Sequence, residues 1–185
     1  MKTFITGLIF GICLVPVLLF LYILSGRAPV AAPDRPLPLE EFIARTALHA
    51  RINREMPKGV PLAVNEATIL AGAQVYKRYC GGCHGMLGQP ESPVAKGMSP
   101  HPPQLLEPDS MVTDDPPGES YWKVRNGIRL SGMPSFQASL SEEQMWQVSI
   151  LLANADKVSD AVKQELTFTP PPPPPPPAPA APAKK

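Results

Sequence analysis

The chain has few cysteines and few histidines, and this scarcity limits the sites that it can form. Its 185 residues include 3 cysteines and 3 histidines. Two of the cysteines are Cys80 and Cys83, and the third, Cys13, lies in an apolar stretch, so no framework of structural disulfides is available. A structural zinc site would need a second close pair of ligands, and the histidines outside the Cys80 region, His49 and His101, are far apart in the sequence.

Net charge is also small, at +1. Proteins that bind nucleic acid usually carry a strongly basic patch, so we expect no nucleic-acid partner. A chain of this length has room for one domain of about 100 residues with appendages at its ends.

Residues 80–84 read Cys-Gly-Gly-Cys-His, and this C-x-x-C-H string is typical of covalent attachment of c-type haem. Each thiol would add to one haem vinyl group, and His84 would offer a ring nitrogen to the iron as proximal ligand. A thioredoxin-like redox pair would need a strand before the motif, whereas a helical pattern ends at Cys80. A plain disulfide between Cys80 and Cys83 is possible, but it leaves His84 unexplained.

The N-terminal residues 4–24 are apolar and uncharged. As a helix they would be about 30 Å long, which matches the thickness of a hydrocarbon core. This predicts a transmembrane helix. The alternative is a cleaved signal peptide, whose apolar region is usually shorter.

Further helices are predicted from apolar periodicity and capping residues. Residues 39–55 form an amphipathic pattern that ends before Pro57. Residues 65–79 begin with Asn65 as a plausible N-cap. A short helix over 119–126 would be closed by Gly127. The pattern over 141–153 starts with a capping box, Ser141 with Gln144. The chain is therefore predicted to be all-α.

Two further features give the chain a specific resemblance. Gly72 and Tyr76 precede Cys80 by eight and four residues, and residues 132–134 read Gly-Met-Pro. With the C-x-x-C-H string, these features resemble class I cytochrome c, and in particular its bacterial membrane-anchored monohaem members. The resemblance covers residues 65–155 and implies an all-α fold around one covalent haem c, in which the first and last helices cross.

The resemblance also implies roles for residues beyond the motif. Met133 would be the distal iron ligand, ahead of Met98, Met86 and Met111, with His101 as the outside candidate. The Pro103 carbonyl would orient the proximal histidine, with Pro102 as the fallback. Tyr121 and Trp122 would pack in the haem pocket, and Arg125 would neutralise a haem propionate or be a solvated charge.

The chain thus divides into four predicted segments. Residues 1–26 are the anchor, 27–64 a spacer with a juxtamembrane helix, 65–155 the haem domain and 156–185 a proline-rich tail that includes an unbroken proline run over 170–177. Haem attachment takes place on the outer face of an energy-transducing membrane, so we expect an inner-membrane protein whose haem domain faces the periplasm.

No organised acid, base or nucleophile accompanies the motif, so we predict an electron-transfer protein and not an enzyme. Protein redox partners are expected. Two alternatives are a haem-based gas sensor or peroxidase with an open iron site, and a fixed haem subunit of a respiratory or dehydrogenase complex.

Overall fold

The computed structural model describes residues 2–167, and within them all regular structure is helical. Of the proline-rich tail predicted over 156–185, residues 168–185, which include the proline run over 170–177, lie outside the described residues. Within residues 2–167, eight α-helices are joined by loops and two short 3₁₀ turns, and an isolated bridge links Leu87 to Thr167. The helices are α1 (Lys2–Leu24), α2 (Glu40–Glu55), α3 (Glu66–Tyr79), α4 (Gly81–His84), α5 (Pro93–Lys96), α6 (Pro117–Asn126), α7 (Glu142–Leu152) and α8 (Asp160–Leu166). The all-α prediction is confirmed.

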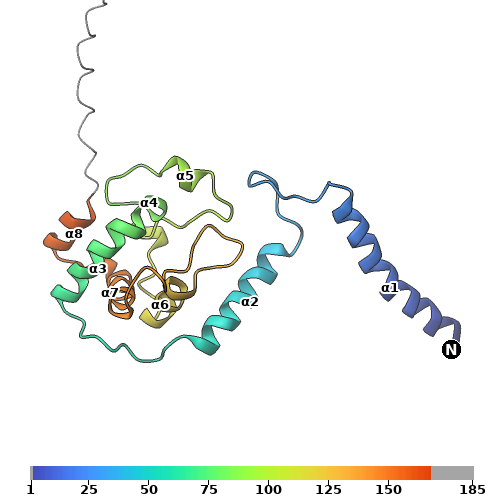
Figure 1. Ribbon diagram of the computed structural model, residues 1–185, viewed down its shortest axis with the longest axis horizontal. Helices are drawn as coiled ribbons and strands as arrows, with labels where there is room; N and C mark the ends of the chain where they lie inside the picture. The colour runs from blue at the N-terminus through green and yellow to red at the C-terminus, as the bar shows by residue number, and fades with distance from the viewer. Residues whose placement is uncertain (1, 168–185) are drawn as a thin grey trace, which may run out of the picture.

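Helix α1 stands apart from the packed helices (Figure 1). Its large apolar side chains from Phe10 to Leu24 are exposed along most of its length. The segment predicted as a transmembrane helix, residues 4–24, is helical, but no helix within residues 2–167 combines the length and hydropathy required to cross a membrane.

The core forms where α3 and α7 cross. Tyr76 and Val148 are fully buried there, and Leu151 packs in the same cluster. Gly72 makes the close approach possible, because a side chain at this position would overlap the main chain of Gln147. The crossing of the first and last haem-domain helices, expected from the family resemblance, is therefore present.

Side-chain caps fix the starts of both crossing helices. Asn65 Oδ1 accepts a hydrogen bond from the Thr68 amide, and Ser141 and Gln144 form both bonds of the predicted capping box. Because caps depend only on neighbouring residues, these starts could be predicted from the sequence.

Two elements outside residues 65–155 also pack on the core. Helix α8 lies against α3, with Val162 and Leu166 buried and an ion pair between Lys77 and Glu165. The C-terminal end of α2 packs on α6 through Ile52, which is 1% exposed. The packed unit thus extends at both ends beyond the segment that carries the resemblance.

Candidate haem-binding site

The two cysteines lie at a junction between helices. Helix α3 ends at Tyr79, and Cys80 leads directly into the single turn α4, in which the amides of Cys83 and His84 donate to the Cys80 carbonyl oxygen at 3.1 and 2.9 Å. Residues three apart on a helical turn lie on the same side, so both sulfurs can reach one edge of a planar group. Cys80 and Cys83 are half-buried free thiols, not a disulfide.

Burial raises the pKa of the Cys80 thiol to about 12, and the neighbouring Cys83 adds to the rise. The group is therefore a neutral thiol at physiological pH. Within residues 2–167 no three side chains of His, Cys, Asp or Glu come together as a metal site.

His84 is fixed by a contact from the long loop that follows it. Its Nδ1 lies 2.8 Å from the Pro103 carbonyl oxygen, which can only accept, so Nδ1 carries the proton and Nε2 keeps its lone pair. Burial lowers the pKa of His84, and the bond to Pro103 opposes that change only in part. A neutral imidazole with one free nitrogen is the form that binds a metal ion.

Tyr76 supports the same turn from α3. Its hydroxyl lies 3.0 Å from the His84 carbonyl oxygen and 2.9 Å from that of Gly85, so its single proton is shared between two acceptors. Burial raises the pKa of Tyr76 well above its ordinary value, and the hydroxyl remains a donor. A main-chain acceptor leaves no mark in the sequence, so this hydrogen bond of Tyr76 could not be predicted from it.

The long loop after His84 is also tied to the cysteine segment. The side-chain Nε2 of Gln104 donates to the Cys83 carbonyl oxygen at 3.1 Å. The Ser92 hydroxyl donates to the Gly82 carbonyl oxygen at 2.8 Å. The Leu105 amide donates to the His84 carbonyl oxygen at 3.2 Å. The contacts of Ser92 and Gln104 were not predicted from the sequence. Only the contact of Gln104 had a signal there, because Gln104 directly follows Pro103.

Met133 lies half-buried on the irregular loop between α6 and α7 and packs against the core. Its amide donates to Ser131 Oγ at 3.2 Å, and its carbonyl oxygen accepts from the Ile128 amide at 3.1 Å. Phe136, a few residues later, makes an edge-to-face contact with Tyr79 at a centroid distance of 6.2 Å. The methionine loop is thereby joined to the end of α3, next to Cys80.

The other ligand candidates occupy different surroundings. Met86 is buried against Gly81, under the cysteine turn. Met98 lies against Gly132, and Met111 is half-buried. His101 is exposed, and its Nε2 contacts the Glu91 carboxylate. Pro102 is buried, and its carbonyl oxygen accepts from the Gln104 side chain.

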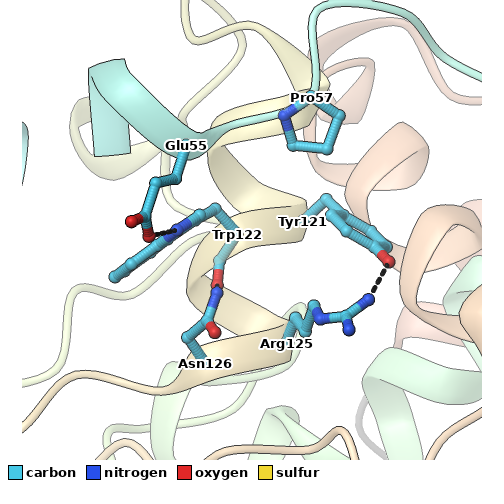
Figure 2. Close-up of a pocket in the computed structure, with 6 residues that line it drawn as sticks. All are labelled: Glu55, Pro57, Tyr121, Trp122, Arg125 and Asn126. Carbon is cyan, nitrogen blue, oxygen red and sulfur yellow. Dashed lines mark hydrogen bonds between the residues drawn. The ribbon is translucent and has the colours of Figure 1, made fainter. Parts of the chain in front are cut away.

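Trp122 and Arg125 are not brought into the hydrogen-bond network around Cys80 and His84. Together with Glu55, Pro57, Tyr121 and Asn126 they line a cavity of about 250 Å³ between α2 and α6 (Figure 2). Trp122 Nε1 donates to Glu55 at 3.3 Å, and Arg125 donates to the Tyr121 hydroxyl and to Glu142, both at 3.2 Å. Their predicted haem contacts stay predictions.

The residues around α4 fit a covalently held haem. The donor set consists of two thiols on one side of a helical turn, followed by a neutral imidazole that is oriented by a carbonyl and has a free nitrogen. A thioether sulfur is available on the loop that contacts the end of α3 through Phe136. Imidazole and thioether are the axial ligands typical of low-spin cytochrome c iron.

Comparison with known proteins agrees with this chemistry. Residues 67–150 match the family model described as "Cytochrome C oxidase, cbb3-type, subunit III". A chain in the structure of the reducing HAO-like protein complex of Kuenenia stuttgartiensis is 28% identical to this one, with a TM-score of 0.44. That alignment covers 55% of this chain and 48% of the other, so this chain spans about half the length of the structure that it matches. No curated protein is detectably similar. Residues 67–150 are thus similar to a family of c-type cytochromes.

Proposed function

We propose that the protein is a membrane-anchored cytochrome c with a single haem, which transfers single electrons between protein redox partners on the periplasmic side of the inner membrane. The observation that carries the proposal is the oriented His84 ring directly after two free thiols, with Nδ1 held by Pro103 and Nε2 left to bind iron. The bound haem would supply an iron that alternates between the ferrous and ferric states.

The chain's own residues would hold this centre still. Cys80 and Cys83 would fix the porphyrin, and Pro103 would keep the His84 ring in one orientation. Met133 would supply the second axial ligand from a loop whose main chain is hydrogen-bonded on both sides of it. Little rearrangement on electron transfer follows when both ligands are fixed in advance.

Intact-mass measurement of the protein made in a host that matures c-type cytochromes tests this proposal. One haem mass is expected on the wild-type chain, and C80A/C83A is expected to lose it. C13A is the matched control, because Cys13 is a free cysteine outside the motif, and it should keep the haem. An unmodified wild-type chain would refute the proposal.

The state of the iron separates electron transfer from the other haem chemistries. With both ligands in place we expect a far-red iron–thioether absorption band in the oxidised protein, absent in M133A, and no spectral change when carbon monoxide is added to the reduced protein. Rapid binding of carbon monoxide to the wild type would favour a gas sensor or peroxidase.

Anchoring rests on the exposed apolar side chains of α1. We expect the protein to stay with the membrane fraction in alkaline carbonate and to be released by deletion of residues 2–24. Protease added outside spheroplasts should digest the haem domain. A mass that lacks the N-terminal residues would show instead that this segment is a cleaved signal peptide.

A fixed subunit of a respiratory complex is the second candidate, since the matching family model is described as an oxidase subunit. Purification in mild detergent distinguishes the two. A carrier should elute alone, whereas a subunit should elute with a constant set of partner chains.

A further inference from the structure

Gly132, the residue before the proposed distal ligand Met133, has no side chain, and the side chain of Met98 fills the space where one would lie. The terminal methyl group of Met98 occupies the place where a Cβ on Gly132 would lie, and the Met98 sulfur is 3.3 Å from that place. Met98 comes from the loop after α5, far from Gly132 in the sequence. Its side chain therefore lies directly on the main chain next to Met133.

The methionine loop needs support at this point. Its ends are held by main-chain and hydroxyl hydrogen bonds, from Phe136 N to Val124 O at 3.0 Å and from Ser135 Oγ to Arg125 O at 2.6 Å. Leu130 in its middle has a φ of 61° and is 88% exposed. Leucine rarely adopts this left-handed backbone conformation, and its exposed side chain gains no burial in return. Contacts from other segments must then hold the loop in place.

Met98 is itself fixed to the cysteine side of the site. Its amide donates to the carbonyl oxygen of Ala95, which is fully buried in α5. Ser92 caps α5 through the Ala95 amide and donates to the Gly82 carbonyl oxygen at 2.8 Å. A short path of contacts thus runs from Gly82, between the two cysteines, through α5 to Gly132.

We propose that Met98 is a positioning residue for the distal ligand: its side chain presses on Gly132 and keeps Met133 in place to bind the iron. The inference rests on the proposed function, in which Met133 is that ligand. It also assigns a role to Gly132, since any larger residue would displace Met98. In this arrangement packing, not the sulfur, is the property of Met98 that matters, so leucine should replace it.

The test compares M98A, M98L, G132A and the double variant M98A/G132A in the haem-loaded full chain, with M111A as the control for loss of a half-buried methionine elsewhere. Two readouts report on the ligand: the affinity of added imidazole, which competes with Met133, and hydrogen exchange at the Met133 amide. Imidazole binds only while Met133 is off the iron, so a tenfold rise in the fraction of open loop tightens its binding about tenfold, as long as the open form stays the minor one.

M98A should bind imidazole about tenfold more tightly than wild type, with faster exchange at the Met133 amide, while M98L and M111A should stay within about twofold of wild type. G132A should resemble M98A, because the new methyl group and the Met98 side chain cannot share one place. The double variant should be closer to wild type than the sum of the single changes predicts, because the alanine methyl enters the space that Met98 leaves.

Three results would overturn the inference. M98A that behaves like M111A, or single changes that simply add in the double variant, would show that the contact does not position the loop. Loss of the far-red band in M98A with its retention in M133A would make Met98 the ligand itself, against both this inference and the assignment of Met133. A wild-type chain without haem would refute the proposed function, and this inference with it.

Discussion

Replacement of Gly72 by alanine tests the helix crossing on which the domain depends. A Cβ on Gly72 would overlap the Gln147 carbonyl oxygen, and it would lie 2.7 Å from the Gln147 carbonyl carbon and 3.1 Å from the Leu151 Cβ. Carbon atoms in contact are about 3.5–4.0 Å apart. Helices α3 and α7 must therefore separate by about 1 Å to accept the methyl group.

The cost follows from what that separation does to the interface. A gap of about 1 Å removes up to half of the dispersion energy of each contact pair, and the interface contains the fully buried Tyr76, Val148 and Leu151. Overpacking of this kind costs about 1–3 kcal/mol, whereas the better helix propensity of alanine returns about 1 kcal/mol at most. We place G72A near the upper end, at a net loss of about 2 kcal/mol in the free energy of unfolding.

Chemical denaturation of the haem-loaded chain, followed by helical circular dichroism, measures this loss. G59A is the matched control, since a Cβ on Gly59 meets no atom within 4 Å, and its effect should stay within about 0.5 kcal/mol of wild type. If G72A were as stable as G59A, the close crossing would not be a constraint on the fold, and the steric explanation for a glycine at position 72 would be wrong.

Three more substitutions test the site and its surroundings. Y76F removes the donor to the His84 and Gly85 carbonyl oxygens and should lower the free energy of unfolding by about 1–2 kcal/mol in urea denaturation; an unchanged midpoint would mean that water replaces the hydroxyl. G127A should lower the free energy of unfolding by about 2 kcal/mol or more and weaken the far-red band. The reasons are that φ at Gly127 is 67° and that a Cβ there would lie 2.6 Å from the Pro134 carbonyl carbon. A variant with wild-type stability and spectrum would contradict this prediction. The hydrogen bond from Arg51 of the same helix, with smaller contributions from Arg54 and from Trp122 of α6, lowers the pKa of Glu55 from 4.5 to about 2. The stabilisation that the ionised Glu55 gives to α2 and to its contact with Trp122 is therefore complete above pH 4.5 and is lost as the pH falls toward 2. In a fluorescence titration of the tryptophans, E55Q should lose this pH dependence, and an identical titration in E55Q would refute it.

The sequence was most informative where the determining contacts are local. The start of α3 at Asn65 and the start of α7 at Ser141 depend on side chains that bond amides three residues away. The end of α6 depends on Gly127, which takes a backbone conformation that other residues rarely adopt. Such features need no knowledge of the tertiary fold, so composition and spacing were enough to predict them.

Contacts between distant segments could not be derived in the same way. The Ile52 side chain is buried although it lies outside the predicted haem domain, and Gly118 approaches the Pro57 main chain so closely that a Cβ would overlap the Pro57 carbonyl oxygen. The sequence does not show which segment packs against Ile52 or Gly118. Whether an isoleucine is buried, or a glycine lies close to another main chain, depends on which segment packs against it in the tertiary fold.

The placement of Tyr121 and Trp122 shows a second limit. Neighbouring residues on a helix point about 100° apart, so Tyr121 and Trp122 point to different sides of α6. From the sequence, both were expected to pack in the haem pocket, and this expectation stays a prediction. In the structure Tyr121 stacks on Trp146 of α7 at a centroid distance of 4.2 Å, whereas Trp122 turns to Glu55 of α2 (Figure 2). Helix α6 therefore divides its aromatic side chains between two neighbours.

The methionines raise the same question for the iron ligand itself. Met86, Met98, Met111 and Met133 all follow the C-x-x-C-H string, and their chemistry is identical, so only their surroundings can separate them. Met86 fills the space beneath Gly81, and Met98 fills the space that Gly132 leaves open. Both are thus used in packing against a glycine of one of the two ligand segments. Met133 packs against the core from a loop in which its amide and its carbonyl oxygen are both hydrogen-bonded, and the structure records no glycine contact for its side chain within residues 2–167. Gly81 and Gly132 thus each leave room for a methionine side chain, and the proposal that Met133 binds the iron gives Met86 and Met98 the role of packing beside the ligand segments.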